Sequence, residues 1–190
     1  MPKSVLLDRD GVINRRIRRG YVTSWKRFIF LPGVLEGLRR LSLAGYSIIV
    51  VSNQAAVGKG LMTPSDLDEI TRRFVKKART HGGPIDAVYY CMHRKEARCR
   101  CRKPRPGLLL QAQADHHLIL SETYLIGDSP SDLMAARQAG CPVVMVNSNP
   151  AYLRKTLAHP PAFVVPDFSA AVDILLSATP QNEQLPQPII

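Results

Sequence analysis

The sequence of 190 residues lacks any apolar run of the roughly 18 residues that a membrane-spanning helix needs. Its first residues, Met-Pro-Lys-Ser, lead into a short apolar stretch without the pattern of a signal peptide. Aromatic residues make up only 6%, and no nucleic-acid stacking motif stands out among them. Four cysteines in a chain of this size do not favour a disulfide framework. These absences favour a cytoplasmic globular protein.

Acidic residues are also scarce. The chain has 15 Asp and Glu against 26 Lys and Arg, which gives a formal net charge of +11. This excess of positive charge favours either nucleic acid or a small polyanion as partner. Much of it lies in two runs, 15–19 and 94–105. Basic runs are usually solvated surface, but both of these adjoin candidate motifs, which favours an attraction for phosphate.

The length and the 45% hydrophobic content are typical of one ordinary globular domain. We expect a single domain over residues 1–178. The segment 179–190 is rich in Pro and Gln and is predicted to be a disordered tail.

The stretch SVLLDRDGVIN, residues 4–14, contains the first candidate site. Its apolar residues 5–7 suit a buried strand, which ends at Asp8 and Asp10 and is followed by Gly11. Because residues i and i+2 of an extended backbone point to the same side, both carboxylates can face one pocket. The same residues also fit an ordinary Asp-Gly turn, so this stretch alone leaves both interpretations open.

The rest of the chain alternates predicted strands with predicted helices. Residues 55–62, with two glycines, are expected to form a loop. Further strands are predicted at 47–52, 87–90, 123–126, 143–146 and, weakly, 163–165. Helices are predicted at 34–43, 64–80, 106–117, 131–139, 152–157 and 170–176. This alternation indicates an α/β fold with a doubly wound, mostly parallel sheet.

Polar residues follow the predicted strands. Parallel strands place their carboxyl ends along one edge of the sheet, where open α/β proteins bind ligands. We therefore expect five residues to converge on one crevice: Asp8, Ser52, Cys91, Asp128 and Asn147.

These residue types suit phosphoryl transfer. Asp8 is the candidate nucleophile, because carboxylates form aspartyl-phosphates. Asp8 and Asp128 together suit Mg²⁺, which binds carboxylates and substrate phosphates. Ser52 and Asn53 offer a hydroxyl and an amide to phosphoryl oxygens, and Lys103 offers a positive charge.

Asp10 is the candidate general acid and base. At an ordinary pKa, holding its proton at neutral pH costs about 4 kcal/mol. Either the pKa of Asp10 is raised in a closed site, or a small protonated fraction suffices. Asp132, one helical turn after Asp128, is expected to hold a metal-bound water or to orient a neighbour.

Three of the four cysteines lie in one short segment. Cys91-x-His93 and Cys99-x-Cys101 form a Cys₃His set, a standard tetrahedral zinc set, with tighter gaps than in a zinc finger. Free thiols in a reducing cytosol are the alternative. A zinc ion here would be structural, because protein atoms fill all four positions, and it would fix the loop that delivers Lys103.

Four motifs, in this order, resemble those of the haloacid dehalogenase superfamily: Asp8-x-Asp10-Gly, Ser52-Asn53, Lys103-Pro104 and Gly127-Asp128-x-x-x-Asp132. The match spans residues 4–148. It implies a Rossmann-like fold in which Asp8 is the nucleophile, Asp10 is the acid and base, and the last motif holds Mg²⁺. Since Asp10 would contribute its backbone carbonyl to the metal, the implied magnesium set is Asp8, Asp10 and Asp128.

Within that superfamily, Cys-x-His and Cys-x-Cys-Arg-Lys-Pro resemble the D-glycero-D-manno-heptose 1,7-bisphosphate 7-phosphatases. The strings Asp-Arg-Asp-Gly-Val-Ile-Asn, Gly-Tyr-Val and Ser-Asn-Gln strengthen the match. The resemblance implies a small Mg²⁺- and Zn²⁺-containing enzyme without a large cap domain, which removes the C7 phosphate through an aspartyl-phosphate. We expect Asn53, Arg102 and Asn14 to contact the substrate.

This chain departs from the pattern at two places. The gap between His93 and Cys99 is short, and Ser129 stands where a lysine is expected. Both departures leave the catalytic motifs intact but bear on substrate identity.

Two other functions fit parts of this pattern. Histidinol-phosphate phosphatases share the fold, the metals and the motifs. A nucleic-acid-binding zinc knuckle would explain the basic charge, but acidic residues at the strand ends would repel a phosphate backbone. We therefore expect a monomer that acts on a small phosphorylated sugar, with neither membrane nor nucleic acid as partner.

Overall fold

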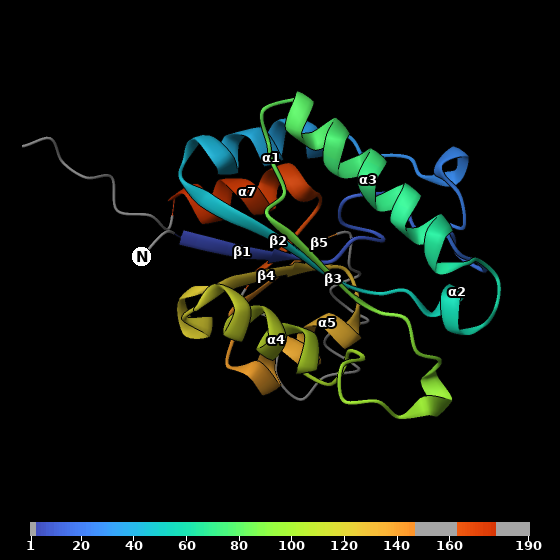
Figure 1. Cartoon of the computed structure of the whole chain (residues 1–190). Helices are drawn as coiled ribbons and strands as arrows, with labels where there is room; N and C mark the ends of the chain where they lie inside the picture. Colours follow the sequence, from blue (N-terminus) through green and yellow to red (C-terminus); the bar gives the residue numbers. More distant parts are fainter. Residues whose placement is uncertain (1–2, 147–162, 178–190) are drawn as a thin grey trace, which may run out of the picture.

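The computed structural model describes residues 3–146 and 163–177. The predictions for Asn147, for a helix at 152–157 and for the tail at 179–190 lie outside these residues. In the described part, six parallel strands form one sheet in the order β3-β2-β1-β4-β5-β6 (Figure 1). The strands are β1 (Lys3–Leu7), β2 (Tyr46–Asn53), β3 (Ala87–Cys91), β4 (Tyr124–Gly127), β5 (Val143–Val146) and β6 (Phe163–Val165).

Helices cover both faces of the sheet. Figure 1 shows α1, α3 and α7 on one face and α4 and α5 on the other. This is the doubly wound α/β fold predicted from the alternation of strands and helices. The helices are α1 (Val34–Leu43), α2 (Ala55–Gly58), α3 (Pro64–Thr80), α4 (Gly107–His116), α5 (Pro130–Ala139) and α7 (Phe168–Ser177), with 3₁₀ turns η1 (Trp25–Arg27), η2 (Lys95–Ala97) and η3 (Leu120–Glu122).

Local sequence signals set several helix ends. At the start of α3, the Thr63 hydroxyl accepts a hydrogen bond from the Asp66 amide, and the Asp66 carboxylate accepts one from the Thr63 amide. This reciprocal capping satisfies amide groups that the first turn leaves unpaired. After α1, Gly45 has φ +78°, the left-handed conformation expected of a glycine that ends a helix.

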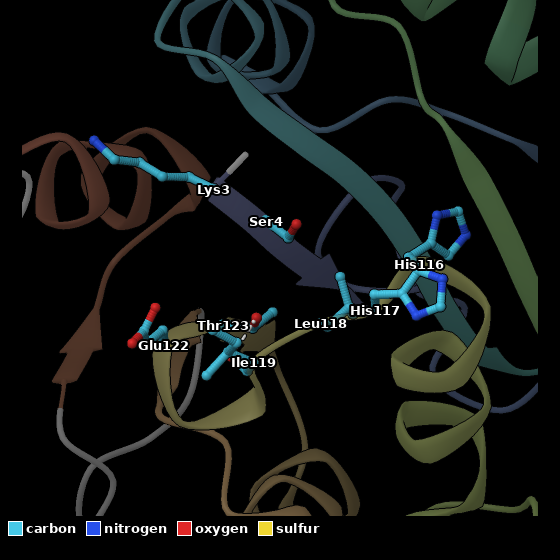
Figure 2. A pocket seen from close by; sticks show the side chains of 8 residues that line it. All are labelled: Lys3, Ser4, His116, His117, Leu118, Ile119, Glu122 and Thr123. Atoms are coloured by element: carbon cyan, nitrogen blue, oxygen red, sulfur yellow. Dashed lines mark hydrogen bonds between the residues drawn. The ribbon is translucent and has the colours of Figure 1, made fainter. Parts of the chain in front are cut away.

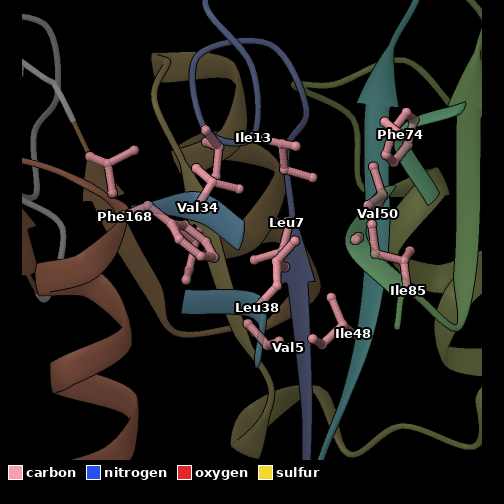
Figure 3. Close-up of a cluster of buried hydrophobic side chains, with 14 of the residues drawn as sticks. Val5, Leu7, Ile13, Val34, Leu38, Ile48, Val50, Phe74, Ile85 and Phe168 are labelled. Atoms are coloured by element: carbon pink, nitrogen blue, oxygen red, sulfur yellow. The ribbon is translucent and has the colours of Figure 1, made fainter. Parts of the chain in front are cut away.

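The hydrophobic core lies on both sides of the sheet. Val5 and Leu7 of β1 and Ile48 and Val50 of β2 pack toward α1, α3 and α7 (Figure 3). The alternate residues of the same strands, including Leu6, belong to a second cluster with α4 and α5. Because both faces of these two strands are buried over most of their length, β1 and β2 contain continuous apolar runs rather than alternating apolar and polar residues.

The prediction of a loop over residues 55–62 was wrong in part. Residues 55–58 form α2, in which Ala56 is fully buried. The Gly58 amide donates to the Met92 carbonyl at 3.0 Å, so packing against the segment after β3 stabilises this single turn. Gly60, with φ +68°, follows in the expected loop.

The described residues contain no large inserted cap domain between these elements. Nor does any helix within residues 3–146 and 163–177 combine the length and apolar character that crossing a membrane requires.

Candidate active site

A cavity of about 250 Å³ lies at the carboxyl edge of the sheet, where parallel α/β sheets bind ligands. It is lined by residues that follow β1, by the segment 16–22, by the end of β2, by the cysteine-bearing loop and by the start of α5. Seven of the lining residues are candidates from the sequence: Asp8, Asp10, Ser52, Asn53, Arg102, Lys103 and Asp132.

Three carboxylates meet at this edge. Oxygen atoms of Asp8, Asp128 and Asp132 lie within 4.8 Å of one another. Gly11 makes this approach possible, because a Cβ atom there would clash with Oδ2 of Asp128. Its φ of +100° also favours glycine. The predicted convergence of the first and last motifs is confirmed.

Lys103 connects two of these carboxylates. Its Nζ atom lies 3.0 Å from Oδ1 of Asp8 and 2.5 Å from Oδ1 of Asp132, and it donates to the Val51 carbonyl at 2.8 Å. The side chain is almost fully buried. Asn53 holds the Lys103 backbone from both sides, donating to its carbonyl at 2.9 Å and accepting from its amide at 3.1 Å. Asn53 therefore positions Lys103, although its side chain also lines the cavity.

Asp132 belongs to the N-terminus of α5. Its Oδ2 atom accepts from the Ser129 amide at 3.0 Å and from the Ser129 hydroxyl at 2.5 Å. Its other oxygen faces Lys103. Of the two roles expected for Asp132, the structure corresponds to the second, orienting a neighbour. The residue that replaces the expected lysine, Ser129, is part of this cap.

Asp10 accepts hydrogen bonds from three side chains: Arg9 at 3.0 Å, Asn14 at 2.8 Å and Gln54 at 2.8 Å. Burial raises the pKa of Asp10, but the Arg9 charge and these hydrogen bonds outweigh it and hold the pKa below its usual range. The carboxylate is therefore ionised at neutral pH in this arrangement, which is the form that accepts a proton.

Two of these partners were not predicted from the sequence. The guanidinium of Arg9 is fully buried and lies 6.0 Å from the Phe28 ring and 5.9 Å from the Tyr90 ring. The sequence signal for Arg9 is its position between two acidic residues, two residues after the end of a buried strand. Gln54 follows Ser52-Asn53 and reaches Asp10 because α2 begins at the next residue.

The remaining candidates lie in different surroundings. Ser52 is buried, lines the cavity and accepts from Gln54 at 3.2 Å. Arg102 lines the cavity from its rim, and its Nη1 atom lies 3.4 Å from the His93 carbonyl oxygen. Asn14 is fully buried behind Asp10 and is absent from the cavity wall. That position suits holding Asp10 and leaves no exposed surface for the predicted substrate contact.

Burial and mutual repulsion disfavour the ionised forms of the Asp8 and Asp128 carboxyl groups. Burial raises the pKa of Asp128 to about 8, the Asp8 charge adds to the rise, and Arg16 opposes it. Burial also raises the pKa of Asp8, against the effect of Lys103. A divalent cation bound to both carboxylates would stabilise their ionised forms. The oxygen donors and their excess of negative charge therefore fit Mg²⁺.

The predicted zinc residues also come together. The Sγ atoms of Cys91, Cys99 and Cys101 lie 3.3–3.6 Å from one another, and Nδ1 of His93 lies 3.3 Å from Cys101 and 3.6 Å from Cys91. Bond lengths of about 2.3 Å to sulfur and 2.1 Å to nitrogen in a tetrahedron give similar spacings. The four donors fit Zn²⁺.

A second cavity, of about 180 Å³, lies at the opposite end of β1. Figure 2 shows it beside Lys3 and Ser4, near His116 and His117 at the end of α4. Among its lining residues, Glu122 is the one carboxylate. It therefore lacks the paired acids and the buried lysine found at the carboxyl edge.

Comparisons with known proteins agree with this site. The family described as "HAD-hyrolase-like" matches residues 100–171. The D-glycero-beta-D-manno-heptose-1,7-bisphosphate 7-phosphatase of Helicobacter pylori (strain ATCC 700392 / 26695) is 33% identical, over 91% of this chain and 97% of that protein. The D-glycero-alpha-D-manno-heptose-1,7-bisphosphate 7-phosphatase of Mycobacterium bovis is 40% identical, over 75% of this chain and 78% of that protein.

A similar solved structure is the D,D-heptose 1,7-bisphosphate phosphatase from B. bronchiseptica, complexed with magnesium and phosphate. It is 32% identical and covers 93% of this chain and 99% of its own, with a TM-score of 0.87. The phosphatase from Burkholderia Thailandensis of the same name is 29% identical, with a TM-score of 0.70 over 92% of this chain and 99% of its own.

Proposed function

The chain belongs to the D-glycero-D-manno-heptose-1,7-bisphosphate 7-phosphatase family, within the haloacid dehalogenase superfamily, and from this we propose that it removes the C7 phosphate of the heptose bisphosphate. It is a phosphatase that hydrolyses phosphomonoesters. The observation that carries the proposal is that the Asp8 carboxylate, which lines the cavity, lies close to that of Asp128 and pairs with Lys103.

Asp8 is the proposed nucleophile. One of its carboxylate oxygens is held by Lys103, so the carboxylate has a fixed orientation beside the cavity. Attack on phosphorus forms an aspartyl-phosphate and breaks the bond from phosphorus to the C7 oxygen. Lys103 then lies near both the attacking carboxylate and the phosphoryl oxygens, where its charge stabilises the transition state.

Magnesium is the proposed cofactor, held by the side chains of Asp8 and Asp128 and by the backbone carbonyl of Asp10. When bound, Mg²⁺ would neutralise charge on the phosphoryl oxygens and help to orient the phosphate. The protein's own contribution is to hold the carboxylates close together, which Gly11 permits.

Asp10 is the proposed acid and base. As the acid it gives a proton to the departing C7 oxygen; as the base it then takes a proton from the water that attacks the aspartyl-phosphate. Arg9, Asn14 and Gln54 hold its carboxylate in the ionised form. Proton donation to the C7 oxygen therefore relies on the small fraction of Asp10 that is protonated. Proton abstraction from the attacking water uses the ionised form, which prevails.

We also propose that Zn²⁺ occupies the Cys91, His93, Cys99 and Cys101 set and orders the loop that carries Arg102 and Lys103. The two residues directly after Cys101, Arg102 and Lys103, line the active-site cavity. A metal ion that fixes Cys101 would therefore also fix the backbone that carries these two side chains. Unpaired cysteines in the described residues are consistent with a reducing compartment, and we propose that the enzyme works as a monomer in the cytoplasm.

Phosphate release from a panel of substrates tests the proposal. The panel contains both anomers of the heptose 1,7-bisphosphate, histidinol phosphate and a 3′-phosphorylated oligonucleotide. We expect kcat/KM for one heptose anomer to exceed that for the last two substrates by about 10²-fold or more. The product should keep its C1 phosphate. Faster hydrolysis of histidinol phosphate, or loss of the C1 phosphate, would reject the proposed substrate.

A further inference from the structure

Arg16 lies against the carboxylates of the active site. Its Nη2 atom is 2.6 Å from Oδ1 of Asp128 and 4.0 Å from Oδ2 of Asp8. Both carboxylates belong to the set assigned above to magnesium. In the described structure, the guanidinium thus neutralises the charge that a bound cation would neutralise.

The charges of the cluster do not favour Arg16 and a divalent cation together. When all three are ionised, the carboxylates of Asp8, Asp128 and Asp132 carry three negative charges against the two positive charges of Lys103 and Arg16. A divalent cation with Lys103 balances the three carboxylates without Arg16. With Arg16 still in place, positive charge exceeds negative charge, and the guanidinium repels the metal at short range.

Arg16 is only partly enclosed by the rest of the site. It lies in a segment without helix or strand, between Asn14 and η1. Its side chain is 46% exposed, whereas that of Asp128 is 9% exposed. It also lines the cavity together with Ile17 and Tyr21. The guanidinium can therefore leave Asp128 and still face the cavity. A phosphate dianion that enters the cavity brings new negative charge, with which Arg16 can pair.

We propose that Arg16 is a substrate-binding residue that exchanges partners: it pairs with Asp128 in the metal-free protein and with a phosphate group of the substrate once the metal has bound. Arginine suits this exchange, because its planar group forms paired hydrogen bonds with carboxylates and phosphates alike. The inference rests on the proposed function for the identity of the cation and of the anion.

Calorimetric binding of Mg²⁺ alone tests the first half of the exchange. Arg16→Gln removes the competing charge, and we expect Mg²⁺ to bind about fivefold more tightly, the factor that corresponds to one partly exposed ion pair. Arg19→Gln is the matched control. Arg19 is an exposed arginine of the same run that forms no ion pair among the described contacts, and its variant should bind Mg²⁺ as the unmodified chain does.

Binding of inorganic phosphate at saturating Mg²⁺ tests the second half. We expect Arg16→Gln to bind phosphate about fivefold more weakly, to raise KM more than it lowers kcat, and to be partly rescued by Arg16→Lys. Unchanged or weaker Mg²⁺ binding, unchanged phosphate binding, or the same changes in Arg19→Gln would each overturn the proposal. If both binding changes occur but the heptose bisphosphate is not hydrolysed, the proposed substrate fails and the role of Arg16 stands.

Discussion

Each of three aspartates in this site forms an ion pair with a basic side chain. Asp8 faces Lys103, Asp10 faces Arg9, and Asp128 faces Arg16. Lys103 and Arg9 are buried, so these pairs are less screened by solvent and salt than surface pairs. Removing one partner leaves the other buried without a counter-charge, which is costly.

Asp8→Asn should abolish catalysis while keeping the shape of the side chain. An amide is a poor nucleophile, so we expect phosphate release to fall at least about 10³-fold. The comparison is with Asp68→Asn, an exposed position on α3. Circular dichroism and zinc content should match in both variants. Turnover near the original rate in Asp8→Asn would remove Asp8 as the nucleophile.

At the scale of elements, the segment between β3 and α4 connects the metal set to the site. Cys91 ends β3, and Arg105 donates to the Cys99 carbonyl at 3.0 Å and also to that of Arg98. Between them, η2 is a short turn whose residues are all exposed. With so few buried side chains of its own, this segment has little packing to hold it, so metal binding would contribute much of its order.

Cys101→Ala should therefore remove zinc and lower activity together. We expect zinc to fall from about one atom per chain to nearly none, and kcat/KM to fall about 10²-fold, an amount that a displacement of order 1 Å can cause. Elemental analysis and phosphate release measure the two effects. Cys141→Ala is the control, because Cys141 is buried near Thr123, away from the set. Full activity of zinc-free protein would refute the ordering role.

The order of motifs allowed much of the site to be predicted. Asp8, Asp128 and Cys91 each lie at or directly after a strand end, and a parallel sheet places such ends together. Arg9 could not be assigned a role from the sequence, since its partner rings come from Phe28 and Tyr90, far away in the chain. Asn14 was assigned to the substrate because local spacing does not reveal which side chains are buried.

The helices and strands were predicted closely where caps and apolar runs agree. α3 begins at Pro64 and ends at Thr80 as Thr63, Pro64 and the following glycines indicate. α2 was missed because it is one turn long and depends on contacts with the segment after β3, which no local pattern contains. Short elements held by distant contacts are the ones that sequence patterns fail to predict.

At the scale of the whole molecule, the acidic cluster makes stability depend on pH. The pKa of Asp128 is about 8 in the folded chain because of burial and the Asp8 charge, against 3.8 for the ordinary carboxyl. An acid whose pKa is raised by folding contributes stability that is fully present below its pKa in the unfolded chain. That stability is lost as pH rises through its pKa in the folded chain. The lowered pKa of Asp10 makes the folded state more stable as pH rises, but this gain is reached well below neutral pH and does not change between about pH 6 and pH 8.

The magnesium-free protein should thus lose stability progressively between about pH 4 and pH 8, the unfolded and folded pKa of Asp128, and added Mg²⁺ should restore it, because the cation replaces the proton on Asp128. We expect the Mg²⁺-dependent rise in Tm to be larger at the upper end of this range. Scanning calorimetry with and without Mg²⁺ measures it, with zinc retained in both samples. Asp128→Asn should show a flatter pH dependence and a smaller response to Mg²⁺. A rise in Tm that shrinks with pH would contradict this account.

β1 is synthesised first but pairs with strands made later on both of its sides. Its neighbours are β2 and β4, and β4 begins only at Tyr124. Until the ribosome has added the residues of β4, one edge of β1 has no partner from its own chain. Unpaired strand edges of this kind promote aggregation. The nascent chain also lacks Asp128 and Asp132 until this point. The second side of β1 therefore gains its partner, and the acidic cluster its last members, within the same few residues of synthesis.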